Sequence, residues 1–347
     1  MLVPPLRKDD LDHVLVHTRG LWDDLRGQRL FITGGTGFFG IWLLESFCHA
    51  NDQFGLQAHA VVLTRNSDAF LSKAPHLTKR ADLKLVTGDV RDFDFPEGDF
   101  SHVIHAGTAS SAPVEPLEMF ATIVDGTRRV LDFAASHGTR KFLFVSSGAV
   151  YGRQPQGLTH LPEDYTGAPD PLDPASAYGE GKRAAELCCV LAGQHHGFET
   201  KIARCFAFVG PHLPFDAHFA IGNFIRDALA HQPIQVTGDG SPMRSYLYAS
   251  DLAAWLWTLL IRAPSRRVYH IGSDDDLSII QLAHLVNETL GNPSNIEITG
   301  RDNLIRPILR YVPSVSRAIQ ELGLKVSVPL ADAILRTARW TRTALVS

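Results

Sequence analysis

A tyrosine and a lysine four residues apart, Tyr178 and Lys182, are the side chains best suited to acid–base chemistry in this sequence. On a helix, residues at this spacing lie on one face, one turn apart. A free tyrosine has a pKa of about 10, and a nearby cation stabilises the phenolate and lowers that pKa. The pair could therefore exchange a proton with a substrate oxygen. The same spacing also occurs by chance in amphipathic helices, so its surroundings decide its meaning.

Ser147 is the third candidate, because it follows a predicted strand over residues 141–145. In open α/β sheets, ligands bind beyond the carboxyl ends of the strands. A serine hydroxyl placed there can hydrogen-bond a substrate hydroxyl or ketone and share its proton with Tyr178. The alternative is a serine that only caps the end of the strand.

A glycine-rich turn, GGTGFFG at residues 34–40, lies between the first apolar run and a helical segment. Glycines allow a tight turn and let the backbone approach a pyrophosphate, and the N–H groups at the start of a helix favour an anion. The position of the turn therefore predicts dinucleotide binding rather than a purely structural bend. The expected contacts are Gly34, Thr36, Gly37, Phe38, Phe39 and Gly40.

The end of the second predicted strand bears on which dinucleotide binds. An acidic residue there would hydrogen-bond the ribose 2′-hydroxyl of NAD. This chain has Thr64, Arg65 and Asn66 instead, and a guanidinium suits a 2′-phosphate. The sequence therefore favours NADP(H), and NAD(H) is the alternative. The arginine could also be an exposed side chain that binds no ligand. After the third strand, Asp89 and Val90 are placed to meet the adenine.

These residues need a scaffold, and the chain alternates between short apolar runs and longer segments with helical spacing. The predicted strands cover residues 29–33, 59–64, 83–86, 102–105, 141–145 and 200–206, and the predicted helices cover 41–49, 116–135 and 176–195. Strands that alternate with helices of this length indicate a parallel sheet covered on both faces. We therefore predict an α/β fold with a Rossmann-like, doubly wound parallel sheet over residues 28–210.

The two ends of the chain differ from this alternating pattern. Residues 1–27 carry apolar side chains at roughly helical spacing, which predicts a helical extension, with a partly mobile tail as the alternative. From residue 211 onward the elements become short, and proline, glycine and histidine become frequent. We predict a smaller substrate-binding lobe over 211–347. Residues 268–271 have the pattern of a core strand, so this C-terminal lobe should be interleaved with the Rossmann sheet.

Composition and charge argue against several other classes of protein. The 347 residues include 33 Lys and Arg against 37 Asp and Glu, so we expect no nucleic-acid partner. The four cysteines lack zinc-ligand spacing, and no apolar run is long enough to span a membrane. Charged residues at 7–10 interrupt the apolar core that a signal peptide needs. We expect a cytoplasmic protein without a metal or membrane contact.

Taken together, the motifs resemble those of extended short-chain dehydrogenases/reductases of the nucleotide-sugar epimerase/dehydratase group. The resemblance runs from Gly27 to Trp340 and rests on GGTGFFG at 34–40, GDVRD at 88–92, SSGAVYG at 146–152, YGEGK at 178–182 and VTGDGSPMRSYLYASDLA at 236–253. The last segment is similar to the sugar-nucleotide-binding segment of UDP-glucuronate decarboxylases and their relatives. The resemblance also implies a homodimer in which the two long helices form a four-helix bundle with those of a second subunit.

By this resemblance Ser147, Tyr178 and Lys182 are the catalytic residues, and the substrate is a nucleotide-diphosphate sugar. Asn223 and Arg244 would contact the diphosphate, and Arg244 suits this role on its own chemistry because a guanidinium matches phosphate geometry. Tyr178 and Lys182 would also contact the cofactor. The remaining cofactor contacts would be Ala106, Gly107, Thr108 and Phe206, and the remaining substrate contacts Ser110, Ser147 and Val236.

The sequence also departs from the family pattern beside the catalytic serine. Dehydratases and decarboxylases of the group carry an acidic residue in the segment that is Gly148-Ala149 here. Elimination of water across C5 and C6 needs a base and an acid at that place, and neither residue supplies one. We therefore expect dehydratase and decarboxylase chemistry to be disfavoured. Ala207 also replaces the asparagine of the family's Arg-x-Phe-Asn, which removes one amide from the pocket.

The function predicted from the sequence is NAD(P)-dependent oxidoreduction of a nucleotide-diphosphate sugar, in which NADPH reduces a 4-keto sugar. Arg65 favours a reductase because NADPH supplies net reduction. A 4-epimerase with tightly bound NAD(P) would use the same residues and is the alternative. A non-catalytic NADP(H)-sensing regulator on the same fold is a third reading, and the presence of Ser147, Tyr178 and Lys182 argues against it.

Overall fold

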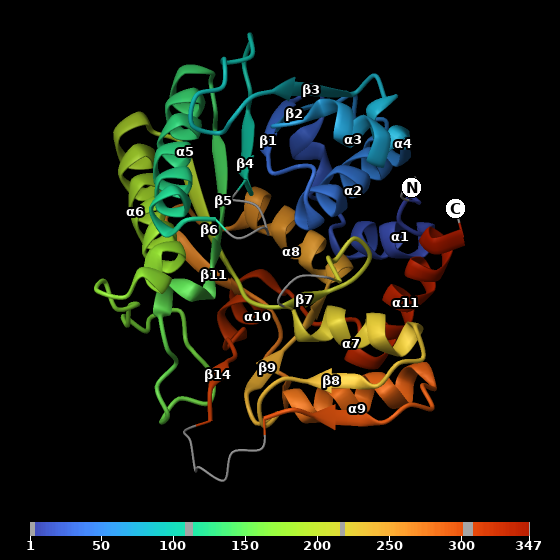
Figure 1. Ribbon diagram of the computed structural model, residues 1–347. Helices are drawn as coiled ribbons and strands as arrows, with labels where there is room; N and C mark the ends of the chain where they lie inside the picture. The colour runs from blue at the N-terminus through green and yellow to red at the C-terminus, as the bar shows by residue number, and fades with distance from the viewer. Residues whose placement is uncertain (1–3, 108–113, 216–218, 301–307, 347) are drawn as a thin grey trace.

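The computed structural model of the chain describes residues 4–107, 114–215, 219–300 and 308–346 (Figure 1). A seven-stranded parallel sheet lies at its centre, in the order β11-β6-β5-β4-β1-β2-β3. The strands are β1 (Arg29–Thr33), β2 (His59–Thr64), β3 (Leu83–Thr87), β4 (His102–His105), β5 (Lys141–Ser147), β6 (Glu199–Cys205) and β11 (Arg267–Ile271). The order reverses between β1 and β4, so the predicted doubly wound α/β fold is confirmed.

Helices cover both faces of this sheet, which explains the continuous apolar runs of its strands. In β1, Leu30 and Ile32 point into one core and Phe31 points into the other, since successive side chains of a strand alternate between faces. All three are fully buried. The first core includes residues of α2 (Phe38–Phe54) and α8 (Ala249–Arg262), and the second includes residues of α5 (Pro116–Ser136) and α6 (Ala177–His196).

The N-terminal segment packs against the body of the protein. It forms α1 (Lys8–His17) and the 3-10 helix η1 (Trp22–Leu25). Asp10 on α1 is only 1% exposed and accepts hydrogen bonds from the Tyr248 hydroxyl and the Arg336 guanidinium, each at 2.9 Å. These bonds tie the start of the chain to its C-terminal helix.

The smaller lobe lies beside the carboxyl end of the sheet and is built from short elements (Figure 1). Its sheets pair β7 with β10, β8 with β13, and β9 with β12 and β14. β11 returns from this lobe to the central sheet, so the two parts are interleaved, whereas the division at residue 210 stays a prediction. The elements are β7 (Phe208–Val209), α7 (Ala220–Leu229), β8 (Ile234–Val236), β9 (Met243–Ser245), β10 (Leu247–Tyr248), β12 (Asp276–Ser278), α9 (Ile279–Leu290), β13 (Ile296–Ile298), β14 (Arg310–Tyr311), α10 (Ser316–Leu322) and α11 (Leu330–Val346).

Short helices fill the connections around the sheet. They are α3 (Ser67–Lys73) and α4 (Pro75–Thr78) after β2, and the 3-10 helices η2 (Gly148–Tyr151) after β5 and η3 (Pro174–Ser176) before α6. Within the described ranges, no helix is long and apolar enough to cross a membrane. The same ranges contain no group of three His, Cys, Asp or Glu side chains arranged to hold a metal ion, and the four cysteines are free thiols.

Candidate active site

A cleft of about 1150 Å³ opens at the carboxyl end of the central sheet, where the strand order reverses. Residues that follow β1, β2, β3, β4 and β5 form one part of its wall, and residues of the smaller lobe form the other. Most residues predicted from the sequence line it, so the structure brings them together: Gly34, Thr36, Gly37, Phe38, Phe39, Thr64, Arg65, Asp89, Val90, Ala106, Gly107, Ser147, Tyr178, Lys182, Phe206 and Arg244.

The glycine loop has the shape of a phosphate cradle. Gly34 has a φ of +72°, and a Cβ on Gly40 would lie 2.3 Å from the Gly34 carbonyl oxygen, so the turn itself requires both glycines. Within the described part of the chain, a Cβ on Gly37 would meet just that same oxygen, at an ordinary 3.5 Å. The protein does not need glycine at position 37, and no side chain caps the start of α2 there. The open space and free N–H groups fit the pyrophosphate of a dinucleotide.

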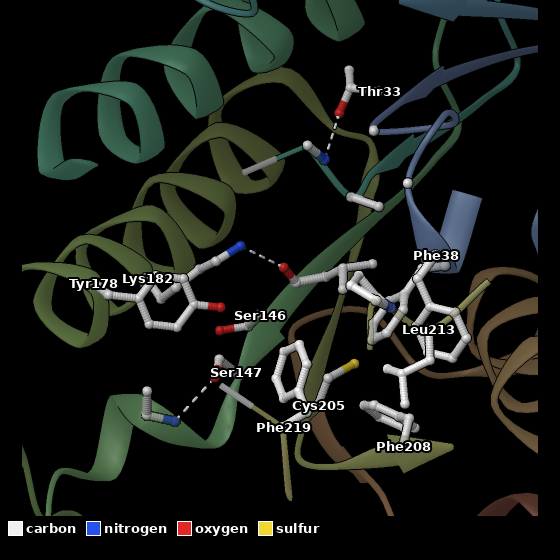
Figure 2. A pocket seen from close by; sticks show the side chains of 18 of the residues that line it. Thr33, Phe38, Ser146, Ser147, Tyr178, Lys182, Cys205, Phe208, Leu213 and Phe219 are labelled. Carbon is white, nitrogen blue, oxygen red and sulfur yellow. Dashed lines mark hydrogen bonds between the residues drawn. The ribbon is translucent and has the colours of Figure 1, made fainter. Parts of the chain in front are cut away.

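A chain of hydrogen bonds behind the loop joins β1, β4 and α5. The Gly107 amide donates to Thr33 Oγ1 at 3.0 Å (Figure 2), and this oxygen lies 2.7 Å from His105 Nδ1. His105 Nε2 lies 3.0 Å from Thr127 Oγ1, whose proton goes to the Ile123 carbonyl. These partners place the His105 proton on Nε2, and burial lowers its pKa to about 3. The neutral His105 ring therefore holds in place the residues that follow β4 in the wall of the cleft.

Tyr178, Lys182 and Ser147 converge where α6 passes the end of β5. Figure 2 shows the Tyr178 hydroxyl pointing toward the serines that end this strand. Lys182 is 1% exposed, and its ammonium donates to the Val145 carbonyl at 2.8 Å and lies 6.0 Å from the centre of the Tyr178 ring. The Ser147 hydroxyl accepts from the Ala149 amide at 3.1 Å. The three side chains thus share one corner of the cleft.

The protonation of this corner differs from the expectation drawn from sequence. Burial raises the pKa of Tyr178, and a hydrogen bond with Ser147 opposes that rise only in part. Burial lowers the pKa of Lys182 to about 8. In the protein without a bound cofactor, Lys182 therefore does not lower the pKa of Tyr178 as expected, because its ammonium is directed at the Val145 carbonyl.

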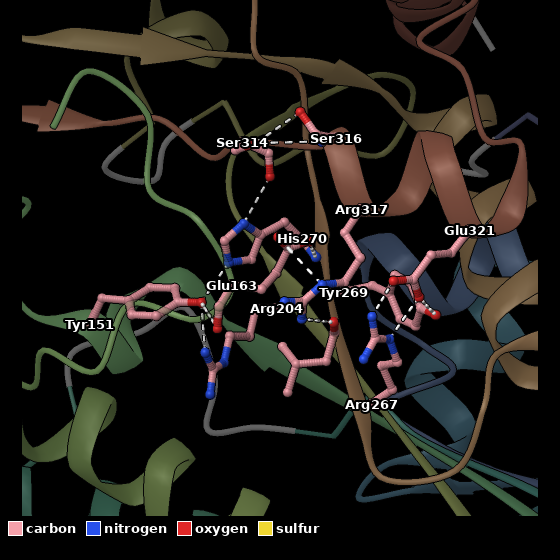
Figure 3. Close-up of polar contacts among 11 residues, drawn as sticks. Tyr151, Glu163, Arg204, Arg267, Tyr269, His270, Ser314, Ser316, Arg317 and Glu321 are labelled. Atoms are coloured by element: carbon pink, nitrogen blue, oxygen red, sulfur yellow. Dashed lines mark hydrogen bonds and ion pairs between the residues drawn. The ribbon is translucent and has the colours of Figure 1, made fainter.

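A buried polar network lies behind the end of β5, and Figure 3 shows its members Arg204, Tyr151 and His270. Ser146 donates to Glu186 at 2.6 Å, and Arg204 donates two hydrogen bonds to the same carboxylate, at 2.9 and 2.6 Å. Arg204 also donates to the Tyr151 hydroxyl at 2.6 Å, which in turn lies 2.6 Å from His270 Nε2. Burial acts to lower the pKa of Arg204, but its partner Glu186 raises it above the usual value. The network fixes Ser146, and through it the neighbouring Ser147.

Tyr311 is a site residue that sequence reasoning missed. It lies on β14, and its hydroxyl is 3.4 Å from Ser147 Oγ and 3.4 Å from the Cys205 carbonyl oxygen. A Cβ on Gly148 would lie 2.8 Å from that hydroxyl and 2.7 Å from the Phe206 ring. Glycine at 148 therefore leaves room for a phenol from the smaller lobe. No motif surrounds Tyr311, so only the pairing of β14 with β9 could have indicated its position.

Several predicted contacts lie outside the cleft wall. Gly40 supports the glycine turn from behind, and Asn66 uses its side-chain oxygen to accept from the Ala69 amide at the start of α3. Asn223 accepts from Arg226 on α7, and Val236 is fully buried in β8. The roles predicted for these residues stay predictions. Thr108 and Ser110 lie outside the described residues.

Asp89 lines the cleft, but its carboxylate is engaged. Arg91 donates to it at 2.8 Å through its side chain and at 3.0 Å through its backbone amide, and these hydrogen bonds lower the pKa of Asp89. Arg91 also binds Glu118 at 2.7 Å. An adenine amino group would therefore share the Asp89 carboxylate with Arg91.

Comparison with known proteins assigns the chain to a family. Residues 30–272 match the NAD dependent epimerase/dehydratase family, and the chain belongs to it. It is 29% identical over 325 residues to UDP-glucuronic acid decarboxylase 1 of Xenopus tropicalis, covering 92% of this chain and 73% of the relative. UDP-glucose 4-epimerase of Thermotoga maritima, solved with UDP-glucose, has a TM-score of 0.76 at 20% identity, covering 91% of this chain and 99% of that one. UDP-glucuronic acid 4-epimerase of Bacillus cereus, solved with NAD, has a TM-score of 0.74 at 19% identity, covering 91% and 99%.

The expectation that decarboxylase and dehydratase chemistry is disfavoured is wrong. Several curated relatives, at 28–30% identity, are UDP-glucuronic acid decarboxylases. The expectation assumed that an acid or base must come from residues 148–149. The structure shows that the Tyr311 phenol of the smaller lobe also reaches the cleft, so residues 148–149 do not limit the proton-transfer groups available there.

Proposed function

We propose that this chain transfers a hydride between the nicotinamide of NAD(P) and C4 of a nucleotide-diphosphate sugar. The observation that carries the proposal is the meeting of Tyr178, Lys182 and Ser147 at the end of β5, in the same cleft as the glycine loop. Bound NAD(P) supplies the hydride donor or acceptor. The family, which is NAD dependent, supports the cofactor class.

Tyr178 exchanges the proton of the sugar oxygen O4. In reduction its phenol donates to the ketone oxygen, and in oxidation its phenolate accepts the hydroxyl proton. Ser147 orients the same oxygen through its hydroxyl. Burial lowers the pKa of Lys182 to about 8, so its ammonium is still mostly charged at neutral pH, and in the protein alone that ammonium is directed at the Val145 carbonyl.

The smaller lobe supplies the groups that meet the rest of the substrate. Arg244 lines the cleft and provides a guanidinium for the diphosphate. Because several relatives are UDP-glucuronic acid decarboxylases, UDP-glucuronic acid is the first sugar to test. Oxidation at C4 of this sugar places a ketone β to the C6 carboxylate, and a β-keto acid readily loses CO₂. A neutral hexose would instead be reduced again at C4.

Arg65 favours NADPH and therefore net reduction of a 4-keto sugar. This side chain is exposed, lines the cleft, and makes no hydrogen bond or ion pair with any residue the structure describes. A 4-epimerase that retains its dinucleotide is the second candidate. It rests on the same three residues, because inversion needs oxidation and reduction at one carbon.

The test supplies the protein with NADPH and a nucleotide 4-keto sugar, and separately with NAD or NADP and either UDP-glucuronic acid or UDP-glucose. NADPH absorbance and mass spectrometry of the sugar products are followed. Consumption of NADPH identifies a reductase, a C4-inverted sugar identifies an epimerase, and CO₂ with a pentose identifies a decarboxylase. Tyr178→Phe should lower any of these rates about 100-fold or more and should change dinucleotide affinity much less, because phenylalanine keeps the ring. Dinucleotide binding without turnover on any sugar, and a Tyr178→Phe protein that keeps its function in cells, would replace the enzyme with a sensing regulator.

We also propose a homodimer formed through α5 and α6. Leu117 on α5 is 73% exposed, and Leu187 and Leu191 on α6 are 58% and 54% exposed. The two helices pack against each other on one face of the sheet (Figure 1). Large apolar side chains on adjoining helices are typical of a surface that a second subunit covers.

A further inference from the structure

The N-terminal segment (residues 4–27) and α11 pack together as a terminal unit, and both lie outside the residues 30–272 that match the family. The Trp340 indole of α11 donates to the Pro5 carbonyl at 3.1 Å, and Arg336 of the same helix donates to Asp10 at 2.9 Å. Figure 1 shows the two ends of the chain side by side. The N-terminal segment therefore fixes the position of α11.

The terminal unit contacts both parts of the protein. The Leu6 amide donates to Glu45 of α2 at 2.8 Å, and His49 Nε2 of the same helix lies 2.7 Å from the Asp12 carboxylate. α2 begins directly after the glycine loop, so these contacts reach the dinucleotide side. α11 packs against α7 and α9 of the smaller lobe. The unit therefore joins the two parts of the chain that form the cleft.

Two indoles hold one segment of the cleft wall, residues 211–214, from behind. Trp42 of α2 donates to the carbonyl of residue 211 at 3.0 Å, and the Trp340 ring lies against the His212 ring with the ring centres 4.4 Å apart. Neither ring nitrogen of His212 has a hydrogen-bond partner in the described ranges. The His212 ring is therefore held by packing, and Trp340 supplies an aromatic face for it. The last two residues of the segment line the cleft.

The backbone of this segment is strained at His212. Its φ is +70°, a left-handed conformation that is uncommon for residues other than glycine. Such conformations persist where the surrounding structure holds them, and they often occur where ligands bind. The Leu213 amide donates to the Gly210 carbonyl at 3.2 Å and closes the turn. Loss of the Trp340 ring would therefore leave the turn free to relax and would move the part of the wall that follows it.

We propose that Trp340 is a positioning residue for substrate binding. The terminal unit fixes its indole, and the indole holds the 211–214 segment in the shape that meets the nucleotide-diphosphate sugar. The inference rests on the proposed function for the identity of that ligand, whereas the coupling of Trp340 to the segment does not depend on it. Because the segment follows β7 and leads into the smaller lobe, its relaxation should weaken the sugar nucleotide more than the dinucleotide.

Hydrogen–deuterium exchange of the full chain without ligand tests the coupling. Trp340→Leu should speed exchange of the Leu213 amide about tenfold or more, and Trp340→Phe, which keeps a ring against His212, should restore most of the protection. Trp22→Leu is the matched control. Trp22 is also a buried indole, which packs on Trp257 with the ring centres 5.1 Å apart. This control should destabilise the protein and leave exchange at Leu213 nearly unchanged.

Calorimetry with UDP-glucose, and separately with NAD and NADP, tests the role in binding. Trp340→Leu should weaken UDP-glucose about tenfold or more and change dinucleotide affinity by about twofold or less. Unchanged exchange at Leu213, or an equal change in Trp22→Leu, would overturn the inference. Faster exchange with unchanged UDP-glucose affinity would overturn the role in substrate binding. A wild type that binds neither dinucleotide would instead overturn the proposed function, and the exchange result would still decide the coupling.

Discussion

Replacing Arg204 with methionine should strongly destabilise the protein, because it leaves a buried carboxylate without its counter-charge. The side chains of Arg204 and Glu186 are only 13% and 9% exposed and are joined by two hydrogen bonds. Methionine fills much of the space of arginine but carries no charge. Among the residues that the structure describes, Ser146 would then be the one remaining hydrogen-bond partner of Glu186, at 2.6 Å.

The size of the effect follows from the partners that remain. Removing one member of a buried ion pair costs about 3–5 kcal/mol, since the other charge stays in a low-dielectric interior. Arg204 also donates to Tyr151, but that hydroxyl keeps His270 as a partner, so this loss adds about 1 kcal/mol or less. Changing Glu186→Gln in the same protein removes the stranded charge. The double variant should therefore be more stable than Arg204→Met alone.

Urea unfolding followed by circular dichroism, at one protein concentration, measures these differences. Arg267→Met is the matched control, because Arg267 lies on the neighbouring strand β11 and pairs with Glu321 at the surface, where the two side chains are 44% and 31% exposed (Figure 3). Exposed pairs contribute little, so this variant should unfold nearly as the wild type does. The reasoning is refuted if Arg204→Met costs less than about 1 kcal/mol, or if the double variant is no more stable than it.

Three further predictions concern the cofactor, acid stability and assembly. Gly37→Ala should fold normally but weaken dinucleotide binding about tenfold or more. Gly40→Ala should instead lower the melting temperature, because its Cβ would overlap the Gly34 carbonyl. Calorimetry measures the binding and thermal unfolding measures the stability, and normal binding by folded Gly37→Ala would contradict the pyrophosphate site proposed for this loop. Burial lowers the pKa of His212 to about 3, against about 6.5 when unfolded, so the unfolded state binds more protons between these values and stability falls as pH falls through that window. His212→Phe should reduce that slope by up to about 1.4 kcal/mol per pH unit, as measured by urea unfolding at about pH 7 and about pH 5, and an unchanged slope would disprove the assignment. Leu187→Glu with Leu191→Glu should convert a dimer into a monomer in light scattering after gel filtration, and a wild type that is already monomeric would refute the proposed interface.

The strands could be predicted closely because a doubly wound sheet buries both faces. Its strands are therefore nearly continuous apolar runs, such as residues 59–64 for β2. The prediction was less accurate where polar residues continue a strand. β5 extends to Ser147, beyond the predicted residue 145, because Glu186 on α6 satisfies the buried hydroxyl of Ser146. A partner so far along the chain is not visible in the local pattern.

The candidate site divides in the same way. The glycine loop, Ser147 and the Tyr178–Lys182 pair occupy one cleft because each follows a strand or faces its end, which spacing can reveal. Tyr311 carries no motif. It reaches the site only through the pairing of β14 with β9, which depends on tertiary packing.

The exclusion of decarboxylases was wrong because it considered only the segment beside Ser147, whereas side chains of both lobes line the cleft. In the proposed function, the groups that exchange the O4 proton come from β5 and α6, so the redox step would take place at one edge of the sheet. Residue 148 lies close to the Phe206 ring and to the Tyr311 hydroxyl of β14, and the Arg244 guanidinium of β9 lies over the Tyr311 ring at 5.9 Å. We therefore propose that side chains of the smaller lobe, rather than residues 148–149, act on a keto sugar formed at C4. In this proposal, changes in that lobe would alter what becomes of the keto sugar while hydride transfer continues, so the serine motif alone would not determine the final product.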